Sequence, residues 1–223
     1  MFPLRDTQPS YSKPVVTVFI IVVNILVFLF EFSLDPYTLN AFIAHYGLVP
    51  DRFHIANIFT SMFLHAGWLH VLGNMWFLWI FGDNIEDILG HEKFLIFYLL
   101  CGIAAGLTQV AFSPDSRVPM VGASGAIAGV MGAYLVKFPH ARIVCLLFIF
   151  FFITTFDVAA WVMLLYWFAL QFFGGFDSIA SSQYSQGGGT AFFAHVGGFL
   201  TGIALIYAMG ARQRYSSRRD LRW

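Results

Sequence analysis

Residues 15–32 read VVTVFIIVVNILVFLFEF, an apolar run close to the roughly 20 residues that a membrane-spanning helix needs. No small-residue cleavage site follows this run, so we expect it to remain as a span and not to be removed as a signal peptide. The whole chain has a similar character, because 59% of its 223 residues are apolar and 11% are charged. So few charges cannot cover a soluble domain of this size, which excludes an ordinary cytosolic enzyme, a nucleic-acid binder and a disordered chain.

Six apolar stretches predict an all-α fold, a polytopic membrane bundle of six transmembrane helices. The predicted spans are Val15–Phe32, Trp68–Phe81, Phe94–Phe112, Ala123–Phe138, Val158–Phe173 and Ala191–Met209. The membrane domain would occupy residues 15–209, between an N-terminal tail at 1–14 and a basic C-terminal tail at 210–223. Some spans are short for a hydrocarbon core about 30 Å thick, so tilt or local bilayer thinning must make up the difference.

The distribution of charge predicts the orientation. Ten of the 12 Lys and Arg residues fall in the tails and even-numbered loops, whereas only Arg52 and Arg117 fall on the other side. Cytoplasmic segments carry the excess of positive charge, so both termini are predicted to be cytoplasmic. The apolar run Ile143–Phe156 is ambiguous between an interfacial, a re-entrant and a short extended segment. The predicted outer loops include Ser33–Leu64 and the Gly- and Ser-rich stretch Gly174–Thr190, which is either a flexible lid or a plain connector.

Polar side chains inside spans are costly and are therefore candidates for function. His70 and Asn74 stand four residues apart, so they share one helix face and can donate hydrogen bonds to one point. For this pair alone the alternative is structural, a hydrogen-bonded pair that holds two helices together.

Ser124 lies between Gly122 and Gly125 in the sequence VGASGA. Glycine lets backbone and substrate approach closely, and the start of a helix offers free N–H groups that stabilise an anion. Position 126 is alanine and no strand precedes the serine, which excludes the nucleophile elbow of the α/β-hydrolases. By itself, a small–Ser–small run in a membrane helix also fits plain helix packing.

His195 precedes Gly198 and Gly202, which form a GxxxG face. The predicted fourth span has glycines at matching spacing, so the two helices can approach at backbone distance. Close contact would bring the imidazole near Ser124, the arrangement that a serine nucleophile needs from its general base. Asp157 lies at the opposite end of the membrane, so the sequence predicts a Ser–His dyad without an acidic third member.

Three separated motifs together resemble the rhomboid family of intramembrane serine proteases. They are HAGWLHVLGN at residues 65–74, GASG at 122–125, and AHVGG at 194–198 followed by Gly202. The resemblance covers nearly all of the membrane region, from about Phe53 to Ala208. It implies a bacterial-type enzyme in a bacterial or archaeal cell membrane. Such an enzyme cleaves peptide bonds in or beside the transmembrane segments of single-span or polytopic proteins within the lipid bilayer.

The resemblance also implies roles for individual residues. Ser124 would be the nucleophile and His195 the general base. His70, Asn74 and the backbone N–H of Ser124 would form the oxyanion hole, with His65 in a supporting place. Four glycines would support the same site by permitting close approach: Gly122, Gly125, Gly198 and Gly202. The fifth span and the loop after it would be the candidate substrate gate. No metal, cofactor or nucleic-acid partner is implied, and the oligomeric state is not predicted.

Two positions depart from the family pattern. Ala56-Asn57 stands where many members have Trp-Arg, which leaves the anchoring of the first outer loop open. Ala128 stands where many members have an aromatic residue against the catalytic histidine, so another group must orient His195. Two other classes of function stay open: a proteolytically inactive relative that binds transmembrane clients, and a small transporter or metal-binding membrane protein that uses the histidines.

Overall fold

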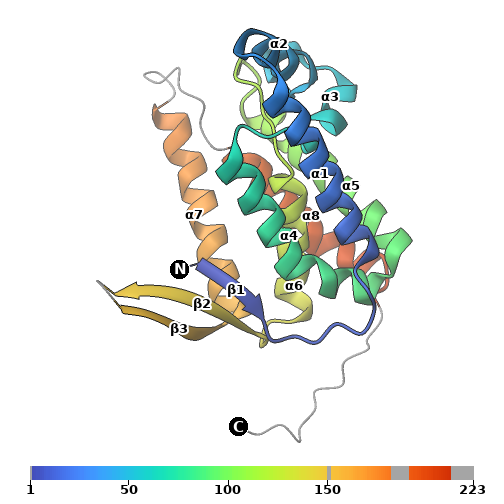
Figure 1. The fold of residues 1–223 in the computed structure, drawn as a ribbon, viewed down its shortest axis with the longest axis vertical. Helices are drawn as coiled ribbons and strands as arrows, with labels where there is room; N and C mark the ends of the chain where they lie inside the picture. The colour runs from blue at the N-terminus through green and yellow to red at the C-terminus, as the bar shows by residue number, and fades with distance from the viewer. Residues whose placement is uncertain (1, 150–151, 182–190, 212–223) are drawn as a thin grey trace, which may run out of the picture.

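The computed structural model describes residues 2–149, 152–181 and 191–211 and is predominantly helical (Figure 1). Its α-helices are α1 (Val15–Ser33), α2 (Pro36–Tyr46), α3 (Ile55–Thr60), α4 (Trp68–Leu89), α5 (His91–Phe112), α6 (Ser124–Lys137), α7 (Ala160–Ser181) and α8 (Phe192–Ala208). Two short 3₁₀ turns are η1 (Pro50–Arg52) and η2 (Ser61–Phe63). Three strands are β1 (Phe2–Asp6), β2 (Arg142–Ile149) and β3 (Phe152–Ala159).

Helix α6 forms the centre of the bundle, because 10 of its 14 residues are buried and it packs against α4, α5 and α8. Its contact with α8 is made through glycine. A Cβ at Gly198 would collide with the carbonyl oxygen of Gly125, and a Cβ at Gly202 would collide with that of Gly129. Small residues on both helices therefore let the two backbones touch, which fixes α8 against the start of α6.

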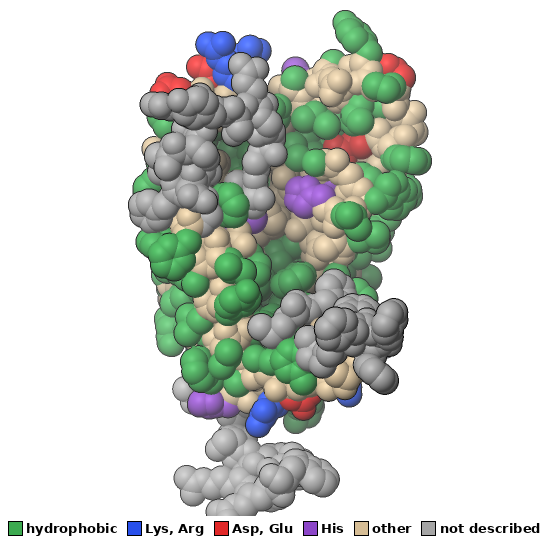
Figure 2. All heavy atoms as spheres, turned by 90° about the vertical axis from the view of Figure 1, so that its left-hand side faces the viewer, with side chains coloured by type: hydrophobic (Ala, Val, Ile, Leu, Met, Phe, Trp, Pro, Cys, Tyr) green, Lys and Arg blue, Asp and Glu red, His purple; other side chains and the backbone are tan. Residues whose placement is uncertain are grey.

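The prediction of six spans is only partly supported. Two helices, α1 and α5, are long and apolar enough to cross a membrane, and a third span arises if α4 is joined to the bent segment Ile55–Phe63. The last three predicted spans correspond to shorter apolar helices, at Ser124–Lys137, Ala160–Phe173 and Phe192–Ala208. Helix α6, with 14 residues, is only about 21 Å long. Charged side chains gather toward the two ends of the molecule, with hydrophobic side chains between them (Figure 2).

The N-terminal residues are part of the fold and not a free tail. Strand β1 pairs antiparallel with β2 in a three-stranded sheet of order β1-β2-β3, so the all-α prediction is wrong at this end of the molecule. Two bonds tie β1 to the helices: the indole N–H of Trp76 donates to the carbonyl of Pro3 (2.7 Å), and the hydroxyl of Tyr134 donates to Asp6 (2.5 Å).

The ambiguous run Ile143–Phe156 belongs to strands β2 and β3 in its described residues, so it is an extended segment. Its β-branched and aromatic residues favour strands, and β1 supplies an additional partner strand. Strand β3 leads directly into α7, which begins at Ala160, two residues after the predicted start of the fifth span.

The predicted outer loops also need correction. Ser33–Leu64 is not a simple loop, because it contains α2, η1, α3 and η2. Gly174 lies within α7, so the loop predicted at Gly174–Thr190 cannot begin there. The remainder of that loop, residues 182–190, and the basic tail at 212–223 lie outside the described residues.

Glu86, near the end of α4, holds the start of α1. Its carboxylate accepts hydrogen bonds from the backbone N–H groups of Val16 and Thr17, both at 2.8 Å, and from the Thr17 hydroxyl at 2.7 Å. The first N–H groups of a helix have no acceptor within the helix, and an anion there also interacts favourably with the helix dipole. Glu86 is fully buried, so this contact joins two helices inside the protein.

We expect Glu86→Ala to lower the free energy of unfolding by about 2 kcal/mol, because buried N–H groups lose a charged acceptor. Thermal unfolding of the full chain in detergent measures this as a lower Tm. Glu92→Ala is the matched control, since Glu92 is an exposed acid in the first turn of α5 and should hardly change the Tm. Equal Tm values for the two variants would contradict the anchoring role of Glu86.

Candidate active site

Ser124 is the first residue of α6, as the sequence predicts. The turn before it needs glycine at position 122, where φ is +124°. A Cβ there would also lie only 2.7 Å from Cε1 and 2.8 Å from Nε2 of the His70 ring. The N–H of Gly122 donates to the carbonyl of Ser61 at 2.8 Å, which fixes the turn against η2. The absence of a side chain at Gly122 therefore lets the ring of His70 lie close to the turn that precedes Ser124.

His195 meets Ser124 directly. Its Nε2 lies 2.7 Å from Oγ of Ser124, although the two residues are 71 positions apart in the chain. The glycine contact between α6 and α8 makes this distance possible, because it sets the backbones of the two helices against each other. The backbone N–H of Ala194 adds a hydrogen bond to Oε1 of Gln109 on α5 (3.2 Å). His195 is 7% exposed, so the pair is largely shielded.

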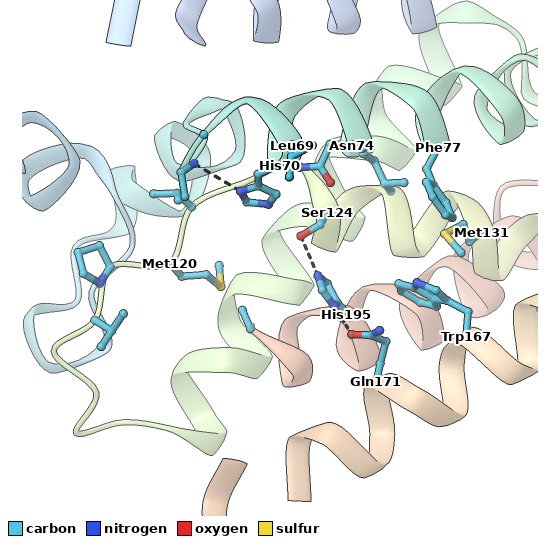
Figure 3. Close-up of a pocket in the computed structure, with 18 residues that line it drawn as sticks. Leu69, His70, Asn74, Phe77, Met120, Ser124, Met131, Trp167, Gln171 and His195 are labelled. Carbon is cyan, nitrogen blue, oxygen red and sulfur yellow. Dashed lines mark hydrogen bonds between the residues drawn. The ribbon is translucent and has the colours of Figure 1, made fainter. Parts of the chain in front are cut away.

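A third side chain completes this arrangement, and the sequence analysis missed it. Nδ1 of His195 lies 2.7 Å from Oε1 of Gln171 on α7 (Figure 3). Trp167 lies one turn earlier on α7, and the centre of its ring is 5.7 Å from the centre of the imidazole. The signal in the sequence was an amide inside a predicted span, the same criterion that selects Asn74. Gln171 and Trp167 are therefore the α7 side chains that lie against the ring of His195.

His70 and Asn74 project from α4 toward the same space as Ser124 (Figure 3). The backbone N–H of Ala66 donates to Nδ1 of His70 at 3.4 Å, which leaves the ring proton on Nε2, the nitrogen nearer to Gly122. Asn74 is 8% exposed, and its Nδ2 has no hydrogen-bond partner among the described residues. A buried amide with unused N–H donors beside a nucleophile is suited to stabilise the negative charge that develops on the substrate oxygen.

These residues line a cavity of about 780 Å³. Its walls come from α4, α6, α7 and α8 and from the segment 118–121. Figure 2 shows this face of the molecule hollowed, with a histidine side chain in the hollow. The lining is mostly apolar, with a few polar groups that converge near Ser124, a composition typical of a binding site for an organic substrate.

His65 lies behind the cavity and does not reach Ser124. Its ring is 2% exposed and stands 5.2 Å from the ring of His70, centre to centre. Its backbone N–H donates to Glu31 of α1 at 3.1 Å. Glu31 is a second polar residue that the sequence analysis missed, a buried acid in the first predicted span. The contact ties the segment before α4 to α1.

The first outer loop is anchored by the residue that departs from the family pattern. Nδ2 of Asn57 donates to the carbonyl oxygens of His45 (3.0 Å) and Gly47 (2.8 Å). Leu48 and Met120 add an isolated antiparallel bridge between this loop and the segment before α6. The absence of Trp-Arg at positions 56 and 57 therefore does not leave the loop unattached.

Comparisons with known proteins identify the family of this chain. A family model described as a Rhomboid domain matches residues 52–212, more than two thirds of the chain. Rhomboid protein 1, mitochondrial, of Saccharomyces cerevisiae is 32% identical over 151 residues, which cover 66% of this chain and 40% of that protein. Rhomboid protease GluP of Bacillus subtilis is 36% identical over 128 residues, 56% of this chain and 25% of that protein.

The human presenilin-associated rhomboid-like protein, mitochondrial, is 38% identical over 85 residues, 37% of this chain and 22% of that protein. The matched part spans less than half the length of each of these three relatives. Because mitochondrial proteins are among them, the comparisons do not support the predicted bacterial or archaeal cell membrane over another membrane. The family model and the relatives confirm the resemblance that the three motifs carry. The chain belongs to the rhomboid family.

Proposed function

We propose that this chain is an intramembrane serine endopeptidase that cleaves transmembrane segments of single-span or polytopic membrane proteins. The observation that carries the proposal is the 2.7 Å contact between Oγ of Ser124 and Nε2 of His195 at the wall of a deep cavity. The family supports the same reaction, because it includes a bacterial relative named as a protease. Ser124 acts as the nucleophile and His195 as the general base.

The proposed reaction runs in two halves. Oγ of Ser124 attacks the scissile carbonyl carbon while its proton passes to Nε2 of His195, and a tetrahedral oxyanion forms. The imidazolium then gives its proton to the leaving amine, the C–N bond breaks and an acyl-enzyme remains. In the second half, water attacks the ester and His195 takes the proton of that water. The imidazolium then gives this proton to Oγ of Ser124 as the ester C–O bond breaks, and the substrate leaves with a new carboxyl end.

We propose that three donors facing the same cavity as Ser124 bind the oxyanion. They are Nε2–H of His70, Nδ2–H of Asn74 and the backbone N–H of Ser124 itself, at the start of α6. Donors that are already fixed before the reaction stabilise the charge without reorganising, which makes such sites a large source of rate acceleration. Gly122, Gly125, Gly198 and Gly202 support this geometry through the close contacts described above.

The substrate is proposed to enter between α4 and α7. Leu69, Gly73 and Phe77 line the cavity from α4, and Trp167 and Gln171 line it from α7. A transmembrane segment that enters here must leave its helical form, because only an extended chain can present a carbonyl to Ser124. Segments with helix-weakening residues and a small residue before the cut are the expected substrates.

The membrane arrangement belongs to the same proposal. Helices α6, α7 and α8 would complete a six-span domain with α1, α4 and α5, shorter than usual and accommodated by tilt or local thinning of the bilayer. Both termini would be cytoplasmic, since most Lys and Arg residues fall on that side. Within the described residues, no group of three His, Cys, Asp or Glu side chains could hold a metal.

Covalent labelling tests the proposal directly. The full chain in detergent is treated with a fluorophosphonate, and the modified peptide is identified by mass spectrometry. We expect the label on Ser124 in the folded protein and none after heat denaturation, because the reaction needs the base at 2.7 Å. A folded protein that leaves Ser124 unlabelled and cleaves no single-span substrate would be a proteolytically inactive relative that binds transmembrane clients.

A further inference from the structure

We propose that Gln171 is a positioning residue that holds His195 in the tautomer and orientation needed to activate Ser124, in the place where soluble serine proteases use an acid. The inference rests on the proposed function and adds a third member to the dyad. It is carried by the contact of 2.7 Å between Oε1 of Gln171 and Nδ1 of His195 (Figure 3).

The contact selects one tautomer of the imidazole. The carbonyl oxygen of an amide can only accept a hydrogen bond, so Nδ1 of His195 must carry the proton. Nε2 is then unprotonated and can accept the proton of the Ser124 hydroxyl across 2.7 Å. In the other tautomer, Nε2–H would point at Ser124 and could not act as a base.

The contact also fixes the plane of the ring. Position 128, where many relatives have an aromatic side chain, is alanine. Trp167 is inclined to the imidazole by 41° and does not stack on it. Gly198, on the α8 face toward α6, has no side chain to hold the ring. When Ser124 becomes acylated its own bond to His195 is lost, so Gln171 is the hydrogen-bond partner that keeps the imidazole in place for the attack of water.

An amide does this without adding charge. His195 is 7% exposed, and a carboxylate placed beside it would have to be buried in a mostly apolar cavity. The titratable side chains among the cavity-lining residues are His70, from α4, and His195, from α8; α6 and α7 contribute none. The neutral dipole of Gln171 orients the imidazole and favours the transient imidazolium that forms during the reaction.

The position of Gln171 couples the base to the proposed entrance. Gln171 and Trp167 both lie on α7, which forms the cavity wall opposite α4. Strand β3 leads directly into this helix at Ala160. Movement of α7 away from α4 would widen the entrance and would also lengthen the contact between Gln171 and His195. With α7 beside α8, as in the structure, the base is aligned.

Kinetics of three full-length variants test the assignment, with wild type measured beside them on one single-span substrate in detergent. Gln171→Leu removes the acceptor at similar size, Gln171→Glu keeps an acceptor oxygen and adds charge, and Leu170→Ala changes an adjacent exposed residue as the control. For Gln171→Leu we expect kcat to fall about 10- to 100-fold with KM changed less than about twofold, because part of the general-base contribution is lost. The rate of fluorophosphonate labelling of Ser124 should fall in parallel.

Gln171→Glu separates positioning from packing. We expect it to retain more activity than Gln171→Leu and to shift the acidic limb of the kcat/KM profile upward by about one pH unit or more, because a carboxylate stabilises the imidazolium. A side chain that merely packs would not move this limb. Wild-type kcat and labelling rate in Gln171→Leu, or an unmoved acidic limb in Gln171→Glu, would overturn the role of Gln171 while leaving the protease assignment intact. A wild-type protein that neither cleaves nor labels would overturn both.

Discussion

Ser124→Ala is expected to lower the rate of cleavage of a single-span substrate by at least about 10⁴-fold. The hydroxyl of Ser124 is the group that forms the bond to the scissile carbon in the proposed reaction. No other hydroxyl among the cavity-lining residues of the described chain can replace it, since the lining contains one serine and no threonine or tyrosine. The measurement is the initial rate of product formation on a gel, with purified full-length protein in detergent.

The matched control is Ser33→Ala. Ser33 is an exposed residue at the end of α1, where its hydroxyl donates to the carbonyl of Phe30. This variant should cleave the substrate at the wild-type rate. The comparison matters because membrane preparations can contain other proteases, and such an activity would survive in both variants. Equal cleavage by Ser124→Ala and wild type would end the protease proposal.

The parts of the site that the sequence could predict are those that depend on local spacing. His70 and Asn74 are one helical turn apart, and the glycine spacing around Gly125 and Gly198 already indicates that α6 and α8 touch at backbone level. From these patterns a contact between Ser124 and the histidine of α8 can be expected without coordinates. These patterns relate two residues within one helix, or two helix faces whose small residues have the same spacing.

The parts that could not be predicted depend on segments far apart in the chain. The sheet requires residues 2–6 to pair with residues 143–146, and neither segment indicates its partner. Gln171 was visible as an amide in an apolar run, but its role depends on the rotation of α7 about its axis, which no short motif fixes. The number of membrane crossings does not follow from the sequence either, because α6 has only 14 residues and is shorter than the roughly 20 residues that a usual span needs.

Asn74→Ala is expected to lower kcat about 100- to 1,000-fold, equivalent to about 2.7–4 kcal/mol of transition-state stabilisation, with KM little changed. The amide of Asn74 is buried beside Ser124, and its Nδ2 has no acceptor among the described residues, so its N–H groups are available to the oxyanion. The ground-state carbonyl carries little charge and gains little from this donor. The loss of transition-state stabilisation therefore lowers mainly kcat. Progress curves at several substrate concentrations give kcat and KM separately.

Asn74→Asp distinguishes an oxyanion donor from a structural hydrogen bond. Aspartate has nearly the same shape but offers acceptors in place of the N–H donors, and its negative charge would repel the oxyanion. We expect this variant to be at least as slow as Asn74→Ala. Asn40→Ala, an exposed asparagine of α2, is the control and should leave kcat unchanged. An Asn74→Asp variant with wild-type kcat would mean that the amide acts in packing. The oxyanion would then be stabilised by His70 and the backbone N–H of Ser124 alone.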